Sequence, residues 1–241
     1  MITSLENKRV KDWCRLHMRK YRQSECLLYE EETIRAAKDT GHLHTLIYTG
    51  EIPFEWEDSV EVSKEVLDKI SEGRDARYIG VAELLEEKKD YQKRVLILDH
   101  LQDPLNIGRI FETALLFGFD SVILSEGCAD IYHEKALEAS RGALYYLNVS
   151  CGDLLKEIPE MKKAGFRVYA TGLRDETKEL YEVEPYEKMA FILGNEGSGV
   201  RSEVMDIADE IVRIDMDNID SLNVSMAGAI VAYRFRLSNG R

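Results

Sequence analysis

Short blocks of apolar residues alternate with polar blocks along the whole chain, at spacings that predict strands and helices in turn. In the first third of the chain, the expected strands are 26–29, 44–48 and 78–82. The expected helices are 5–21, 31–38 and 64–71, with Ser63 as the N-cap of the last. Strands that alternate with helices predict a small α/β domain ending near residue 85.

A run of charged residues at 86–94 separates this region from longer apolar blocks. We therefore predict a domain at 1–85, a charged linker at 86–94 and a second domain at 95–241. The strands expected in the second domain are 95–98, 121–124, 167–171, 190–193 and 211–214. The helices expected there are 107–117 and 222–237. Continuously apolar strands joined by helices are typical of a parallel sheet covered on both faces, so the predicted fold class is α/β.

Three turns rich in Asn, Gly and Ser follow apolar runs of this second domain, at 98–112, 193–199 and 220–228. They predict one ligand site assembled from separate loops. Glycines at 194, 197 and 199 have no side chain to keep a ligand away from the backbone. Glu196 is the only charged residue among them. For the turn at 193–199, an ordinary connection between a strand and a helix is the alternative interpretation.

The start of the last helix carries short polar side chains. Asp220 or Ser221 is expected to cap it, and its free N–H groups suit an oxygen-rich or anionic ligand group. Asn223 adds a hydrogen-bonding side chain to the first turn. A capped core helix without a role in the site is the alternative. Asn106 also has two interpretations, either as the N-cap of helix 107–117 or as a site residue.

The three turns resemble motifs of the SpoU/TrmH branch of the SPOUT RNA methyltransferases: Leu-Asp-His-Leu-Gln-Asp-Pro-Leu-Asn-Ile-Gly-Arg, Leu-Gly-Asn-Glu-Gly-Ser-Gly and Asp-Ser-Leu-Asn-Val-Ser. That family transfers a methyl group from S-adenosylmethionine to a ribose 2'-hydroxyl of ribosomal or transfer RNA. The resemblance implies a parallel-sheet C-terminal domain with a deep trefoil knot, a homodimer formed through that domain, and an N-terminal substrate-binding domain.

The same resemblance implies roles for individual residues. The cofactor-binding residues would be Thr171, Leu193, Gly194, Gly199, Ile214, Met216, Ser221 and Leu222. The catalytic residues would be Asn106, Arg109, Glu112, Glu196, Ser221 and Asn223.

Glu112 departs from the family pattern, which has an arginine six residues after the motif asparagine. Three explanations stay open. Arg109, one helical turn earlier, takes over the role of that arginine; Glu112 itself acts as the base; or catalysis is lost while cofactor and RNA binding remain. The resemblance therefore predicts a methyltransferase, and Glu112 supports a catalytically impaired RNA-binding or cofactor-binding protein as the alternative.

The net charge of −13 argues against general nucleic-acid binding, which depends on Lys and Arg. Residues 1–24, however, hold seven basic and two acidic side chains, a balance of +5 that leaves −18 for the rest. This segment predicts local RNA contact, or else a solvated helix face. The expected RNA-binding residues are Arg9, Lys11, Arg19, Lys20, Arg22 and, from a weaker motif match, Arg141. Arg141 facing solvent is the alternative.

Other classes of protein are disfavoured by the composition. No window holds the roughly 18 apolar residues of a membrane helix, and the N-terminus lacks a signal sequence, so we expect a cytoplasmic protein. The four Cys and five His show no metal-ligand spacing, and no metal is expected. A small-molecule enzyme that uses the same cofactor is a third possibility, in keeping with the acidic composition.

Overall fold

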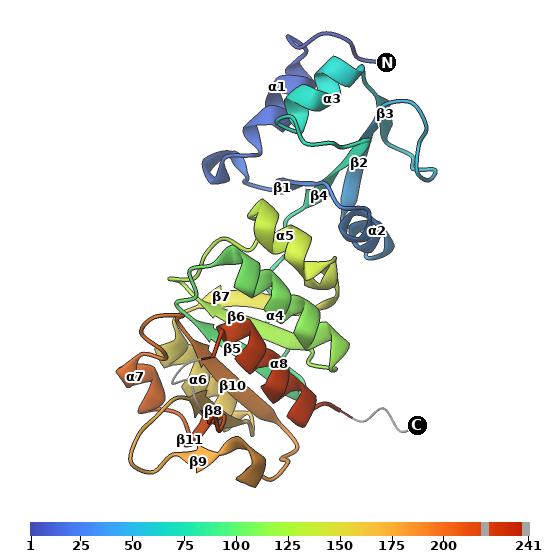
Figure 1. Cartoon of the computed structure of the whole chain (residues 1–241). Helices are drawn as coiled ribbons and strands as arrows, with labels where there is room; N and C mark the ends of the chain where they lie inside the picture. The colour runs from blue at the N-terminus through green and yellow to red at the C-terminus, as the bar shows by residue number, and fades with distance from the viewer. Residues whose placement is uncertain (218–221, 238–241) are drawn as a thin grey trace. The chain divides into compact units, whose positions relative to one another are not determined.

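The computed structural model describes residues 1–217 and 222–237 and divides the chain into two compact units (Figure 1). The first unit is Met1–Glu86 together with Arg141–Tyr146. The second is Glu87–Ser140 together with Leu147–Arg241. The short segment at 141–146, which contains the 3-10 helix η2 (Ala143–Tyr146), belongs to the first unit although it lies in the middle of the sequence of the second.

The first unit is a small α/β layer. Its helices are α1 (Lys8–Arg15), η1 (Arg19–Tyr21), α2 (Glu31–Asp39) and α3 (Lys64–Ile70). Its strands β1 (Glu25–Leu28), β2 (Leu43–Tyr48), β3 (Ser59–Glu61) and β4 (Tyr78–Glu83) form a mixed sheet in the order β1-β4-β2-β3. Val10 and Trp13 of α1 pack with apolar residues of α3 and the sheet, which buries one side of each helix.

The predicted continuous helix over 5–21 is wrong. Helix α1 ends at Arg15, where the Leu16 N–H donates to the carbonyl of Trp13, and the 3-10 turn η1 follows. Val10 and Trp13 are the buried residues of α1; Leu16, just after the helix, packs partly buried against the same core, and Tyr21 is exposed. Ser63 caps α3 as predicted, with its hydroxyl accepting from the Val66 N–H.

The second unit is built on a parallel sheet (Figure 1). Its strands are β5 (Arg94–Asp99), β6 (Ser121–Ser125), β7 (Asn148–Gly152), β8 (Arg167–Thr171), β9 (Lys178–Glu179), β10 (Met189–Gly194) and β11 (Glu210–Arg213). They lie in the order β7-β6-β5-β10-β8-β11-β9, and each neighbouring pair is parallel. The predicted strands of this unit are therefore confirmed, apart from shifts of one residue at their ends.

Helices cover both faces of this sheet. The helices are α4 (Pro104–Leu116), α5 (Glu134–Ser140), α6 (Leu154–Lys163), α7 (Ser202–Met205) and α8 (Val224–Arg234), with the 3-10 helix η3 (Leu180–Glu182). Ile192 of β10 packs in a core with residues of α6 and α7. The next residue, Leu193, contacts Gly228 of α8, which also lies against Ile110 of α4. Because successive side chains of a strand point to opposite faces, α4 and α8 cover one face and α6 and α7 the other.

Helix α4 begins three residues earlier than predicted. Pro104 occupies its first turn, where a missing N–H costs nothing, and the Asp103 carboxylate accepts from the Leu105 N–H at 3.0 Å. Asp103 is therefore the N-cap, and the interpretation of Asn106 as the cap is wrong. The last helix is also shorter than predicted, since α8 runs from Val224 to Arg234. Within the two described ranges, no helix is both long and apolar enough to cross a membrane.

Candidate functional site

Four of the predicted cofactor-binding residues lie at the carboxyl ends of three neighbouring strands: Thr171, Leu193, Gly194 and Ile214. Strand β8 ends at Thr171, β10 ends at Gly194, and Ile214 directly follows β11, and these strands are adjacent in the order β10-β8-β11. The strands β5, β6 and β7 extend the sheet in one direction, while β10, β8 and β11 extend it in the other. In parallel α/β sheets, ligands bind at the carboxyl ends of strands where the direction of winding changes.

The glycine turn after β10 is tightly closed. Asn195 and Gly199 exchange backbone hydrogen bonds of 3.0 and 2.9 Å, and the Asn195 side-chain oxygen accepts from the N–H groups of Gly197 and Ser198. A Cβ on Gly194 would lie 2.1 Å from the Val200 nitrogen, and Gly199 has a φ of +73°. Both positions therefore require glycine, whereas Gly197 has open space beside it.

Glu196 leaves this turn and joins the three predicted loops. Its carboxylate accepts from the N–H groups of Gln102 and Asp103 at 3.3 and 3.2 Å, and from the Asn106 amide at 3.2 Å. The Asn106 oxygen in turn accepts from the Asn223 amide at 3.2 Å. One hydrogen-bonded chain thus connects the turn after β10 with the beginnings of α4 and α8.

The donor and the acceptor of each hydrogen bond in this Asn223–Asn106–Glu196 network are fixed. An ionised carboxylate only accepts hydrogen bonds, so the amide of Asn106 must point its NH₂ group at Glu196 and its oxygen at Asn223. Asn223 must then donate to Asn106, and its oxygen accepts from the Ser225 N–H and hydroxyl at 2.9 and 2.6 Å. Asn223 is the N-cap of α8, a role that we expected for Asp220 or Ser221, which lie outside the described residues.

These donors also set the ionisation of Glu196. Partial burial raises the pKa of the carboxyl group, but the hydrogen bonds from backbone N–H groups and from Asn106 outweigh it and hold the pKa below its usual value. Glu196 is consequently ionised at neutral pH and acts as a fixed acceptor for the loops around it.

Asp99 is a site residue that we did not single out from the sequence. It is the last residue of β5, it is 0% exposed, and its carboxylate accepts from the Arg201 backbone N–H at 2.9 Å and from the Arg201 Nε at 2.8 Å. The ion pair closes the far end of the glycine turn onto the neighbouring strand. A charged residue at the end of a wholly apolar strand was the available signal.

Helix α4 presents the remaining predicted catalytic residues. Asn106 is 3% exposed, Glu112 is half-buried and Arg109 is exposed. Arg109 lies three residues from each of the other two, so all three side chains occupy neighbouring positions on the helix surface.

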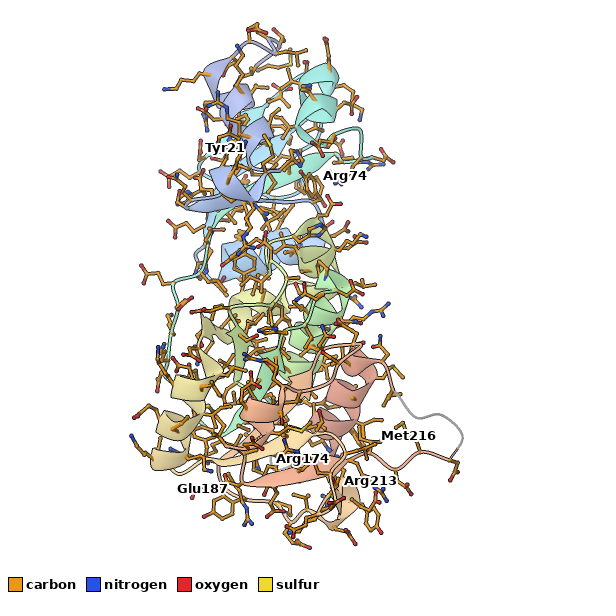
Figure 2. The ribbon with its side chains drawn as sticks, turned by 90° about the vertical axis from the view of Figure 1, so that its left-hand side faces the viewer. Tyr21, Arg74, Arg174, Glu187, Arg213 and Met216 are labelled. Carbon is orange, nitrogen blue, oxygen red and sulfur yellow. The ribbon has the colours of Figure 1, made fainter. Side chains whose placement is uncertain are left out.

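The cofactor-binding prediction includes residues in less enclosed positions. Met216 is exposed after β11, Leu222 is half-buried ahead of α8, and Ser221 lies outside the described residues. Figure 2 shows Met216 and Arg174 toward the same end of the second unit. Arg174, which the sequence analysis missed, fastens the loop after Thr171 to α7 by bonds to Ser202 and Asp206.

The predicted RNA-binding residues lie in the first unit. Arg9 pairs with Asp58 at 3.3 Å and Lys11 pairs with Glu6. Arg19 and Lys20 are exposed on η1, near Tyr21, which Figure 2 labels, and Arg22 is half-buried. Arg141 is exposed to solvent, and its guanidinium forms two hydrogen bonds of 2.8 Å to Glu32.

No group of three or more His, Cys, Asp or Glu side chains within residues 1–217 and 222–237 has the arrangement of a metal site. The site is instead a set of backbone turns, amides and one carboxylate at the ends of parallel strands. Turns at the ends of parallel strands are where α/β proteins with helices on both faces of the sheet commonly bind nucleotide-type ligands.

Comparison with known proteins identifies the family to which this chain belongs. The model of the SpoU rRNA Methylase family matches residues 93–233, which is more than half of the chain. The 23S rRNA (guanosine(2553)-2'-O)-methyltransferase RlmP of Bacillus subtilis is 31% identical over 245 residues, covering 98% of each chain. The chain belongs to the SpoU rRNA methylase family.

Solved structures support the same assignment of the fold. The AdoMet-bound rRNA methyltransferase from Sinorhizobium meliloti gives a TM-score of 0.86 at 24% identity and covers 97% of this chain and 95% of that one. The structure of an RNA 2'-O ribose methyltransferase gives a TM-score of 0.78 at 28% identity and covers 97% of this chain and 96% of that one. The parallel-sheet α/β fold expected for the family is confirmed.

Proposed function

We propose that this protein is an S-adenosylmethionine-dependent RNA methyltransferase that modifies a ribose 2'-hydroxyl of ribosomal RNA in the cytoplasm. The observation that carries the proposal is the hydrogen-bonded chain Asn223–Asn106–Glu196, which holds the three family motifs at one end of the sheet. The full-length similarity to an enzyme that acts on 23S rRNA favours ribosomal over transfer RNA.

The residues present fit S-adenosylmethionine. Gly194 and Gly199 leave the turn after β10 without side chains at two positions, so a ligand can approach its backbone. Thr171 and Ile214 lie at the ends of the next two strands. Met216, an exposed apolar side chain, suits the flat adenine ring. When bound, the cofactor supplies an activated methyl group. The Thr171 hydroxyl donates to the Ile192 carbonyl at 2.8 Å, so this donor is already used between neighbouring strands.

The protein's own task is to align the ribose hydroxyl and to take its proton. The ionised Glu196 receives four hydrogen-bond donors in this structure, so we assign it to positioning rather than to proton transfer. Arg109, exposed on α4, is suited to binding the phosphate beside the reacting ribose. Glu112, one turn further on, is suited to accepting the hydroxyl proton.

Glu112 also supports the second candidate function, a catalytically impaired protein that still binds cofactor and RNA. The variants Glu112→Arg and Glu112→Gln separate the two. If Glu112 is the base, both variants lower kcat while the Kd of the cofactor stays unchanged. If the site has decayed, Glu112→Arg raises methylation above that of the natural chain.

We also propose that the active form is a homodimer formed through the second unit. On α8, Met226, Ile230 and Tyr233 are exposed at spacings of four and three residues, which is one apolar stripe of a helix. A second copy of the chain is the occupant that the family resemblance implies. Light scattering tests this. Ile230→Asp should give monomers, whereas Leu155→Asp, at a leucine of similar exposure on α6, should not.

The central experiment measures methyl transfer from radiolabelled S-adenosylmethionine to 23S rRNA and tRNA transcripts. We expect label on ribosomal RNA, in a dinucleotide that resists alkaline hydrolysis because its 2'-hydroxyl is blocked. Absence of cofactor binding by calorimetry at millimolar concentration, with and without RNA, would contradict the proposal.

A further inference from the structure

The first unit contains a cavity of about 690 Å³ that the family motifs do not touch. It is lined by Lys38 of α2, His44 of β2 and residues 55–58 of the loop between β2 and β3. Its volume lies within the range of small-ligand pockets. The lining combines one aromatic ring with side chains of both charges.

The Trp56 ring lines this cavity, and hydrogen bonds fix its position. Its indole N–H donates to the His44 carbonyl at 2.9 Å, and its own carbonyl accepts from the Ser59 hydroxyl at 2.6 Å. The side chain is only half-buried. A fixed, accessible aromatic ring is the feature on which proteins stack unpaired bases of RNA.

Lys38 is the lysine that lines the cavity, and its Nζ lies 4.6 Å from the centre of the Phe54 ring. The Arg35 guanidinium lies 5.0 Å from the same ring but is paired with Glu31 at 2.7 Å, so Lys38 is the cation suited to a phosphate of the RNA backbone. Lys38 also disfavours a lysine or arginine side chain of a protein partner, the other ligand that a tryptophan among carboxylates would attract.

Three carboxylates also line the cavity, those of Glu55, Glu57 and Asp58. Asp58 is already engaged by Arg9 and by the Thr45 hydroxyl. Glu55 and Glu57 are exposed, and neither forms an ion pair with another described residue. Ionised carboxylates accept hydrogen bonds and cannot donate them, so a base bound here must offer donors.

We propose that this cavity binds one unpaired base of the substrate RNA that carries an exocyclic amino group, guanine in preference to the others. The proposal rests on the RNA methyltransferase function above. The base stacks on Trp56, its N1–H and amino group donate to the carboxylate of Glu57, and Lys38 faces the adjoining phosphate. Uracil is rejected because its single N–H stands between two carbonyl oxygens, which the carboxylates repel. Adenine and cytosine are intermediate, since each places an acceptor beside its amino group.

The two tryptophans of the chain make a direct assay possible. Trp13 is 6% exposed, so a bound base changes mainly the fluorescence of Trp56. The full chain is titrated with the unstructured pentamers UUGUU and UUUUU. We expect quenching by UUGUU with an affinity roughly tenfold above that of UUUUU, the discrimination typical of one bidentate contact.

Variants test each part of the contact, with binding followed by anisotropy of labelled pentamers. Trp56→Leu should remove the preference for guanine, and Trp56→Phe should retain most of it. Glu57→Gln should reduce the preference at least fivefold. Glu65→Gln on α3 is the matched control, since it removes the same charge from an exposed site outside the cavity and should leave the ratio unchanged.

Equal affinity for the two pentamers, or a guanine preference that survives both Trp56→Leu and Glu57→Gln, would overturn the proposal. Tighter binding of an oligoarginine peptide than of UUGUU would also overturn it. Methylation of 23S rRNA is measured on the same preparation. Methylation without a guanine preference rejects the cavity as a base site and leaves the enzyme function intact, whereas loss of both methylation and cofactor binding rejects the function itself.

Discussion

The ion pair between Asp99 and Arg201 should determine how firmly the glycine turn is held against the sheet. Breaking a buried pair by removing one partner costs about 3–5 kcal/mol, because the other charge is left without compensation. Asp99 is 0% exposed, but the Arg201 side chain is 30% exposed, so water replaces part of the lost contact. We therefore expect Arg201→Met to lower the free energy of unfolding of the second unit by about 3 kcal/mol.

Asp99→Asn should be milder. The asparagine oxygen still accepts from the backbone N–H of residue 201, and the guanidinium it abandons can turn toward water. Loss of the charge should cost about 1–2 kcal/mol. The double variant should lose less free energy of unfolding than the two single variants lose together, since the second change removes a group that no longer has a partner.

Calorimetry is the suitable assay, because both tryptophans lie in the first unit and do not report on the second. About 3 kcal/mol corresponds to a fall in Tm of roughly 6–12 °C for a unit of this size. Arg167→Met is the control, because the Arg167 side chain is 45% exposed and its partner Glu210 keeps a second ion pair with Lys178, so stability should change by less than about 1 kcal/mol. Additive effects of Asp99→Asn and Arg201→Met, or a loss no larger than that of the control, would refute the reasoning.

Three further predictions follow from local geometry. Gly194→Ala should weaken cofactor binding at least tenfold in calorimetry, because its Cβ would lie 2.1 Å from the Val200 nitrogen, whereas Gly197→Ala meets nothing nearer than 3.6 Å and should bind normally. Arg94→Leu should lower the calorimetric stability by about 3 kcal/mol, since it leaves the carbonyls of Phe235 and Glu187 without their buried donor; an unchanged Tm would contradict this. The hydrogen bond to Glu25, with a second to Glu83, raises the pKa of His44. The stability that protonated His44 adds is therefore complete below the ordinary histidine pKa near 6.5 and is lost as pH rises through the raised pKa. Titration by NMR should show a lower pKa in Glu25→Gln, and no change there would reject that cause.

The sequence predicted the strands of the second unit well because each is a continuous apolar run. It predicted little between residues 125 and 166, where the structure has α5, β7 and α6. Strand β7 lies at the edge of the sheet with only Val149 and Ser150 buried, and α6 contains Pro159, so neither carries a clear pattern. The trefoil knot and the homodimer depend on chain threading and on a second copy, which no local pattern encodes, and they stay predictions.

The candidate site was predictable as a set of loops but not as a network. Glycines and short polar residues mark the turns in the sequence, and the strand order then brings three of them to one edge. That Glu196 accepts from Asn106, and Asn106 from Asn223, depends on side chains 90 and 117 residues apart meeting within 3.2 Å. Only the folded sheet supplies that information.

The charge distribution limits how this protein binds RNA. Of the seven basic residues in 1–24, Arg9, Lys11 and Arg15 are already paired with acidic side chains, while Arg19 and Lys20 form no ion pair within the described part of the chain. A chain with a net charge of −13 has little overall electrostatic attraction to a polyanion, and contacts to phosphates do not distinguish one sequence from another. Selection of the correct RNA must therefore come mainly from contacts that do not depend on net charge, which are stacking and hydrogen bonding to unpaired bases. A rigid tryptophan flanked by carboxylates meets that requirement where a basic patch would not.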